Sequence, residues 1–175
     1  MTSLLAGCAH KPPTLEPVAS VDLPRFMGDW YVIAHIPSRP ERQAYNAVES
    51  YALDADGRIQ TTFRFRNHGF DAPLETMEPV GYVRPETGNA VWGMQFVWPI
   101  KAEYIIAYVD PGYRVTIIGR SKRDYAWIMA RVPVLEAKEY AALVDRLVAM
   151  GYARDAIRKV PQQWPEAQGD RPPLS

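Results

Sequence analysis

The feature that most constrains this chain is a run of eight short strand-like segments between residues 28 and 131. Each is rich in β-branched or aromatic residues and ends at a turn signal, as at Asp54-Ala55-Asp56-Gly57 and Asp110-Pro111-Gly112. Evenly spaced strands with hairpin-length turns are typical of a β-sandwich or an up-and-down barrel. The predicted strands are Gly28–Ile36, Asn46–Leu53, Arg58–Arg66, Met77–Val83, Ala90–Trp98, Glu103–Val109, Tyr113–Arg120 and Tyr125–Arg131, with a loop at Asn67–Thr76.

The apolar period changes after the last of these strands. Between Pro133 and Met150 the apolar residues fall on one stripe at helical spacing, and Gly151 suits the position just past a helix end. An amphipathic helix needs a surface to cover, so we expect one helix packed on the outside of the sheet. A short strand is predicted at Ile157–Pro161.

The chain length suits a single domain with a sizeable core. We place that domain at residues 25–163. The proline-rich stretch at residues 9–24 is predicted to be a flexible linker, and residues 164–175 a loose tail.

The single cysteine, Cys8, ends the stretch Leu5-Ala6-Gly7-Cys8, which resembles the lipobox of bacterial lipoproteins. Residues 1–8 then read as the remnant of a lipoprotein signal peptide, although only seven residues precede Cys8 and none is Lys or Arg. A lipidated Cys8 would anchor the protein to a membrane. The alternative is a chance occurrence of the motif.

Charge and composition exclude several classes of function. The 20 basic and 20 acidic side chains cancel, so no strong positive field attracts nucleic acid. His10, His35 and His68 lack partners at metal-ligand spacing, so we expect neither a metal nor a cofactor. The sequence has no Gly-x-Ser-x-Gly and no phosphate-binding glycine loop, so we expect no enzymatic activity.

Three stretches, in order, resemble the signatures of the lipocalin family. "GDWY" at Gly28 to Tyr31 is similar to the Gly-x-Trp motif of the first strand. "YVDPGY", containing Asp110 and Tyr113, resembles the second motif, with Val109 in place of threonine and Pro111-Gly112 inserted. "YAWIMARVP" resembles the third motif, which ends in Arg131.

The resemblance implies an all-β fold, an eight-stranded antiparallel up-and-down barrel with one C-terminal helix outside. Trp30 would close one end of the barrel, and Arg131 would lay its guanidinium over the indole. Gly28 would leave room where the chain crosses beneath. These residues, with Asp110 and Tyr113, are therefore expected to be structural and not catalytic.

Eight strands enclose a space just wide enough for side chains or one small ligand. Alternation along the strands predicts an apolar, inward-facing set that would contact a ligand, although a slip of one residue would exchange inside for outside. This set is Val32, Ala34, Phe63, Phe65, Trp92, Met94, Phe96, Ile106, Tyr108, Ile117, Trp127 and Met129. Arg39, Glu41 and Arg42 follow the first strand and would either meet a lipid head group or remain solvated loop charges.

The resemblance implies a carrier that binds a fatty acid, a lysophospholipid or a similar small hydrophobic molecule, for lipid storage, transport or envelope maintenance. Ala9 follows Cys8 in place of aspartate, which favours anchoring on the periplasmic side of the outer membrane. We expect a monomer or a homodimer. Two alternatives stay open: a small enzyme acting on a barrel-bound substrate, and a structural envelope-stress lipoprotein whose barrel is filled by its own side chains.

Overall fold

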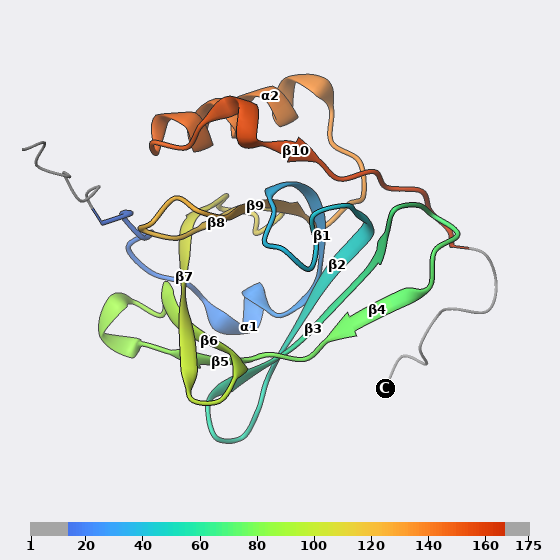
Figure 1. Cartoon of the computed structure of the whole chain (residues 1–175). Coiled ribbons are helices and arrows are strands. Elements are labelled where there is room, and N and C mark those ends of the chain that lie inside the picture. Colours follow the sequence, from blue (N-terminus) through green and yellow to red (C-terminus); the bar gives the residue numbers. More distant parts are fainter. Residues whose placement is uncertain (1–13, 167–175) are drawn as a thin grey trace, which may run out of the picture.

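Strands that follow one another along the chain form a single antiparallel sheet in the computed structural model, which describes residues 14–166 (Figure 1). The predicted lipidation site, Cys8, lies outside the described residues. The barrel strands are β1 (Gly28–Ile36), β2 (Ala44–Leu53), β3 (Arg58–Asn67), β5 (Val80–Val83), β6 (Val91–Val97), β7 (Ile100–Val109), β8 (Val115–Gly119) and β9 (Ala126–Ala130).

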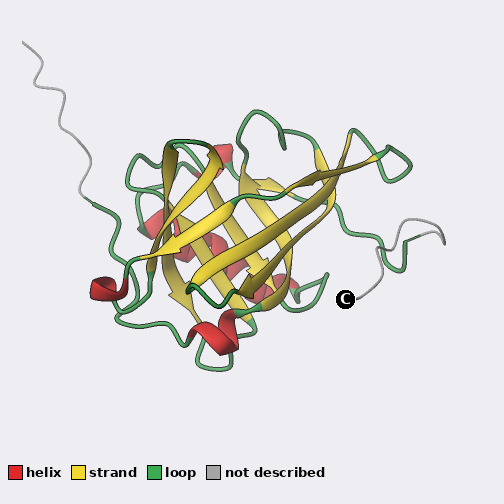
Figure 2. Ribbon diagram, turned by 90° about the horizontal axis from the view of Figure 1, so that it is seen from below, coloured by secondary structure: helices red, strands yellow, loops and turns green. Residues whose placement is uncertain are grey.

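The sheet closes because β1 pairs with β2 through its first half and with β9 through its second half. Every neighbouring pair is antiparallel and the order follows the sequence, so the predicted eight-stranded up-and-down barrel is confirmed. Figure 2 shows these strands wrapping around the interior. A short final strand, β10 (Arg158–Lys159), pairs with Ala34 and His35 on β1.

The fourth position of the barrel is shared by two short strands. β4 (Leu74–Met77) pairs with one half of β3 and β5 with the other half. The predicted loop at Asn67–Thr76 is therefore wrong for its last three residues, which belong to β4. Pro79 separates the two strands because it has no N–H to donate to the ladder, while its carbonyl still accepts from the Thr61 amide at 3.2 Å.

The helix α2 (Ala137–Ala149) lies against the outside of the barrel beside β10 (Figure 1). It buries Leu143, Val144 and Leu147 in a cluster with outward-facing residues of the barrel. The helix begins later than predicted because Glu136 is still extended, with ψ near 143°. It ends at Ala149, and Gly151, two residues further on, has a φ of +94° that suits a residue without a side chain.

The described part of the predicted linker packs against the barrel and is not free. Leu15 and Val21 are buried, and the Val18 amide donates to the Ile106 carbonyl at 2.9 Å. A flexible linker was predicted because the stretch is rich in proline. Its apolar residues, such as Leu15 and Val21, nevertheless pack against the barrel wall. The described start of the predicted tail is also packed, because the Trp164 ring meets Tyr31 edge-on at 5.3 Å.

One end of the barrel is closed by Trp30 and the short helix α1 (Leu23–Phe26), which the sequence analysis did not predict. Trp30 is fully buried, and its indole N–H donates to the Phe26 carbonyl at 2.8 Å. The Arg131 guanidinium carbon lies 3.8 Å from the centroid of the Trp30 ring. Its N–H groups also donate to the backbone carbonyls of Arg25, Phe26, Met27, Asp29 and Tyr113.

Arg131 therefore ties β9 to both α1 and β1 with one side chain. Gly28 has a φ of +90°, and a side chain there would meet Arg131 Nη1 at 3.5 Å. Asp110 and Tyr113 lie at the same end. The Asp110 carboxylate accepts from the Val115 amide at 2.8 Å, and the Tyr113 hydroxyl accepts from the Asp22 amide at 2.8 Å.

Candidate functional site

A cavity of about 730 Å³ opens at the end of the barrel opposite Trp30. Its rim is formed by the loop from Pro37 to Arg42, by Phe96 and Val97 of β6, and by Arg120 and Tyr125. Its volume lies within the ~300–1,000 Å³ range typical of small-molecule sites.

The wall of the cavity is mainly apolar and aromatic. Phe63, Met77, Ala102 and Trp127 point into it from four different strands. Phe63 is held in place by stacking on Phe65, with ring centroids 4.7 Å apart. Apolar surface that faces an open space, and not other side chains, is suited to a hydrophobic ligand.

Glu41 belongs to the rim loop but points inward and is buried. It accepts hydrogen bonds from the Ser38 amide at 3.0 Å and from the Trp127 indole at 3.1 Å. His35 Nδ1 lies 3.5 Å from Glu41 Oε2, which is long for a hydrogen bond. Burial alone would raise the pKa of Glu41, but these neighbours, His35 above all, hold it below its ordinary value.

Glu49 of β2 lies at the inner end of the cavity. It pairs across the sheet with Trp30 on one side and Phe63 on the other, and it is 4% exposed. Its Oε2 has no hydrogen-bond partner among the described residues. Burial raises the pKa of Glu49 to about 8, the negative charge of Glu41 adds to the rise, and a hydrogen bond with the Tyr51 hydroxyl offsets part of it.

Glu49 was not among the predicted site residues. The available signal was the alternation Ala47-x-Glu49-x-Tyr51, which places a carboxyl group on the inward face of a strand. Beneath it, the Tyr51 and Tyr104 hydroxyls are 2.6 Å apart and Tyr104 stacks on Trp92, with ring centroids 5.0 Å apart. These rings fill the barrel below the cavity.

Three predicted ligand residues line the cavity: Phe63, Phe96 and Trp127. Six others face the barrel interior but pack into the core and are not part of the cavity lining. These six are Val32, Phe65, Trp92, Met94, Ile106 and Met129.

The remaining three predictions are wrong, since Ala34, Tyr108 and Ile117 lie in the cluster between barrel and helix. In β1 the pairing shifts between Val32 and Ala34, and in β7 between Ile106 and Tyr108. Each shift is a β-bulge, which inserts one residue and reverses the alternation beyond it. For Ile117 the predicted alternation is wrong by one residue. Its neighbour Ile118 faces the barrel interior, and Ile117 faces outward.

The rim carries exposed basic groups above this acidic interior. Arg39 and Arg42 are exposed. Arg120 lies over the Tyr125 ring at 5.2 Å and pairs with Asp124 at 3.2 Å. The rim is therefore positively charged, whereas carboxyl groups point into the cavity below it.

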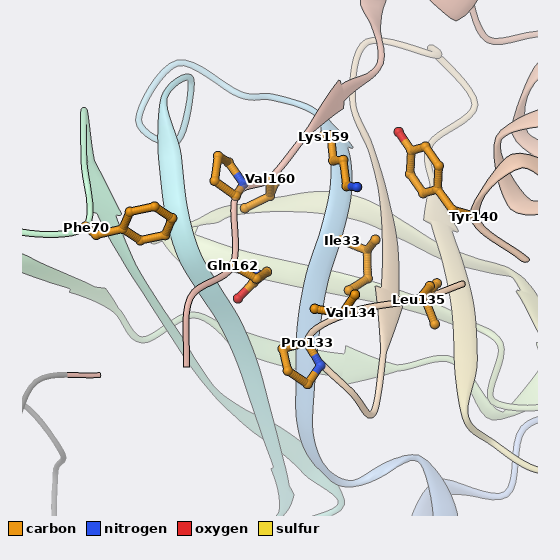
Figure 3. Close-up of a pocket in the computed structure, with 10 residues that line it drawn as sticks. Ile33, Phe70, Pro133, Val134, Leu135, Tyr140, Lys159, Val160 and Gln162 are labelled. Carbon is orange, nitrogen blue, oxygen red and sulfur yellow. The ribbon is translucent and has the colours of Figure 1, made fainter. Parts of the chain in front are cut away.

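A smaller groove of about 260 Å³ lies outside the barrel, between the segment before α2 and the segment after β10 (Figure 3). Ile33, Leu135 and Tyr140 contribute to it, and it shares no lining residue with the cavity. Within residues 14–166 no cluster of side chains could hold a metal ion. No helix in the same range is long and apolar enough to cross a membrane.

Comparison with known proteins agrees with this geometry. A family model described as a lipocalin-like domain matches residues 21–162. Temperature-induced lipocalin-1 of Arabidopsis thaliana is 31% identical over 175 residues, covering 92% of this chain and 87% of that protein. The outer membrane lipoprotein Blc of Escherichia coli K12 is 26% identical, covering 75% of each chain.

Among solved structures, insecticyanin from the tobacco hornworm Manduca sexta superimposes with a TM-score of 0.68 at 19% identity, covering 91% of this chain and 90% of that one. The match of the family model to most of the chain, together with the closed barrel and its open cavity, leads to one conclusion. The chain belongs to the lipocalin family.

Proposed function

We propose that this protein is a lipid carrier, which binds the hydrocarbon chain of a fatty acid or lysophospholipid in its barrel. The observation that carries the proposal is the open cavity of about 730 Å³ with Phe63, Phe96 and Trp127 in its wall. A cavity of this size does not fit a barrel that is filled by its own side chains.

The energetics of burial support a single-chain lipid. A chain of about twelve methylenes leaving water gains roughly 10 kcal/mol, at about 0.8 kcal/mol for each. Association and ordering of the ligand cost roughly 4–15 kcal/mol, so contact with the aromatic wall decides the net affinity.

The distribution of charge supports entry of the apolar end first. An anionic head group at the inner end would be surrounded by apolar side chains and would meet no basic residue of the cavity lining, because Arg39, Arg42 and Arg120 lie at the rim. At the rim it would meet Arg39 and Arg42 in water. The proposed ligand therefore keeps its carboxylate or phosphate at the rim.

The hairpin between β6 and β7 supports exchange of the ligand with a membrane. Val97, Trp98 and Ile100 are 69%, 82% and 70% exposed, and Val97 also lines the cavity. Tryptophan favours the membrane–water interface, and exposed apolar patches mark interaction sites. A bilayer that received this hairpin would lie directly beside the opening of the cavity.

We further propose that lipidated Cys8 anchors the protein to the periplasmic side of the outer membrane. The motif ending at Cys8 supports this, as does the similarity to proteins named outer membrane lipoproteins in Escherichia coli and Vibrio cholerae. Mass spectrometry of the mature N-terminal peptide tests the anchor. Acyl groups on Cys8 are expected, and an unmodified Cys8 in membrane-derived protein would contradict the proposal.

The carrier proposal is tested by extracting the purified protein and identifying the released lipid by mass spectrometry. The delipidated protein is then titrated with a fluorescent fatty acid and with lysophospholipid. We expect a co-purifying single-chain lipid and saturable binding. Turnover of ester substrates without saturable binding of fatty acids would favour an enzyme instead.

A further inference from the structure

The inner end of the cavity contains a carboxyl group, that of Glu49, which interacts with the Tyr51 hydroxyl but keeps one oxygen unpaired within the described part of the chain. Glu49 lines the cavity, is 4% exposed, and has an Oε2 without a hydrogen-bond partner among residues 14–166. A buried polar atom without a partner costs about 1–3 kcal/mol. Such a group, aimed into a ligand cavity, indicates that the ligand supplies the missing partner.

The neighbours of Glu49 narrow the choice of partner. A hydrocarbon end placed against it would leave Oε2 unpaired. A carboxylate would be repelled by Glu41, which its hydrogen bonds hold in the charged form. A hydroxyl group can donate to one carboxyl oxygen and accept from a protonated one, so it complements Glu49 in either protonation state.

We infer that the carrier selects single-chain lipids bearing a hydroxyl group at the end that enters the barrel, where that hydroxyl hydrogen-bonds to Glu49. The inference rests on the proposed function and specifies its ligand class. A lipid with a carboxylate at one end and a hydroxyl at the other would meet Arg39 or Arg42 at the rim and Glu49 at the inner end.

The raised pKa of Glu49 is consistent with this pairing. At neutral pH most of its carboxyl is protonated, so it presents one donor and one acceptor, as a hydroxyl group does.

Matched ligands isolate the terminal hydroxyl. Lauric and ω-hydroxylauric acid form one pair, and palmitic and ω-hydroxypalmitic acid form a second. Two chain lengths are used so that the terminal hydroxyl of at least one pair reaches the inner end of the cavity. The dissociation constants of each pair are measured by displacement of a fluorescent fatty acid from the full chain. The quantity of interest is the ratio of the constant for the plain acid to that for the hydroxylated acid.

The ratio is compared between the parent protein and three variants. In Glu49→Met the ratio should fall about tenfold, because one buried hydrogen bond is lost and the plain acid no longer faces an unpaired carboxyl. In Glu49→Gln, which keeps a donor and an acceptor, it should stay within about twofold. Thr61→Val removes a buried hydroxyl that also has no hydrogen-bond partner among residues 14–166 but lies outside the cavity lining, and it should leave the ratio unchanged.

An unchanged ratio in Glu49→Met, with both acids still binding, overturns the inference and leaves the carrier proposal intact. If neither acid binds the parent protein, the carrier proposal itself fails. Should Glu49→Met not fold, nuclear Overhauser effects in the parent protein decide. Contacts from the terminal CH₂OH of the bound acid to Phe63 are expected, whereas contacts confined to Phe96 at the rim overturn the inference.

Discussion

Glu49→Gln should make the stability of the protein less dependent on pH. The ordinary pKa of this carboxyl is 4.5, and in the folded chain burial raises it to about 8. Below the lower value both folded and unfolded chains hold the proton. Between the two values the unfolded chain releases it while the folded chain retains it, so stability falls as pH rises. Above the higher value the effect is constant.

The size of the effect follows from the same two values. Each pH unit within this window lowers the free energy of unfolding by at most about 1.4 kcal/mol. From about pH 5 to about pH 8 the loss due to Glu49 is at most roughly 3–4 kcal/mol. For a chain of this size that corresponds to a decrease in Tm of roughly 6–16 °C.

The assay is thermal or urea unfolding of the delipidated full chain across this pH range. Glu49→Gln should remove the decline, because an amide does not titrate, while other groups contribute equally to both proteins. Glu78→Gln changes an exposed carboxylate between β4 and β5 and serves as the matched control. Parallel pH profiles for the parent protein and Glu49→Gln would refute the reasoning, since Glu49 would then titrate alike in folded and unfolded chains.

Further predictions concern the two ends of the barrel. Arg131→Met removes the contact with Trp30 and the hydrogen bonds to Arg25 and Phe26 of α1, and should lower the unfolding free energy by roughly 2–4 kcal/mol. Trp98→Ser should weaken binding to anionic vesicles roughly tenfold without changing Tm, because Trp98 is 82% exposed. Phe96→Ala should weaken fatty-acid binding roughly fivefold with little change in Tm, since this ring lines the cavity but is 44% exposed.

The variants at Arg131 and Trp98 each have a matched control of the same residue class. Arg114→Met removes an exposed arginine that pairs with Glu139 and should change Tm little, so an equal effect at Arg131 would contradict its bridging role. Leu53→Ser changes an exposed apolar residue in the β2–β3 hairpin, away from the cavity lining. Equal loss of vesicle binding in Leu53→Ser and Trp98→Ser would contradict a specific role for the β6–β7 hairpin.

The strands were predictable because local turn chemistry and alternation agree with the closed barrel. The predicted bounds of β1 match the structure, and Asp54 accepts hydrogen bonds from the Asp56 and Arg58 amides in the turn that Gly57 completes. The bulges were not predictable from alternation alone. They depend on the pairing of β1 with β9 and of β7 with β8, which places Ala34 and Tyr108 under the helix.

The candidate site was predicted only in part for a related reason. Phe63 and Trp127 lie on regularly alternating strands, so the pattern identified their inward direction. The line between cavity and core depends on depth within the barrel, which alternation does not report, so Trp92 and Met94 were grouped with them. Glu49 was overlooked because a charged residue within a strand is usually assigned to the solvent face.

The central claim is that the barrel cavity binds one hydrophobic chain, and filling the cavity tests it most directly. Ala102 lines the cavity, and Ala102→Trp would place an indole in the space of about 730 Å³. The measurement is the stoichiometry and affinity of a fluorescent fatty acid titrated into the delipidated full chain. We predict saturable binding of one molecule per chain, lost in Ala102→Trp while the Tm stays within a few degrees. Undiminished binding in a folded Ala102→Trp would contradict the claim.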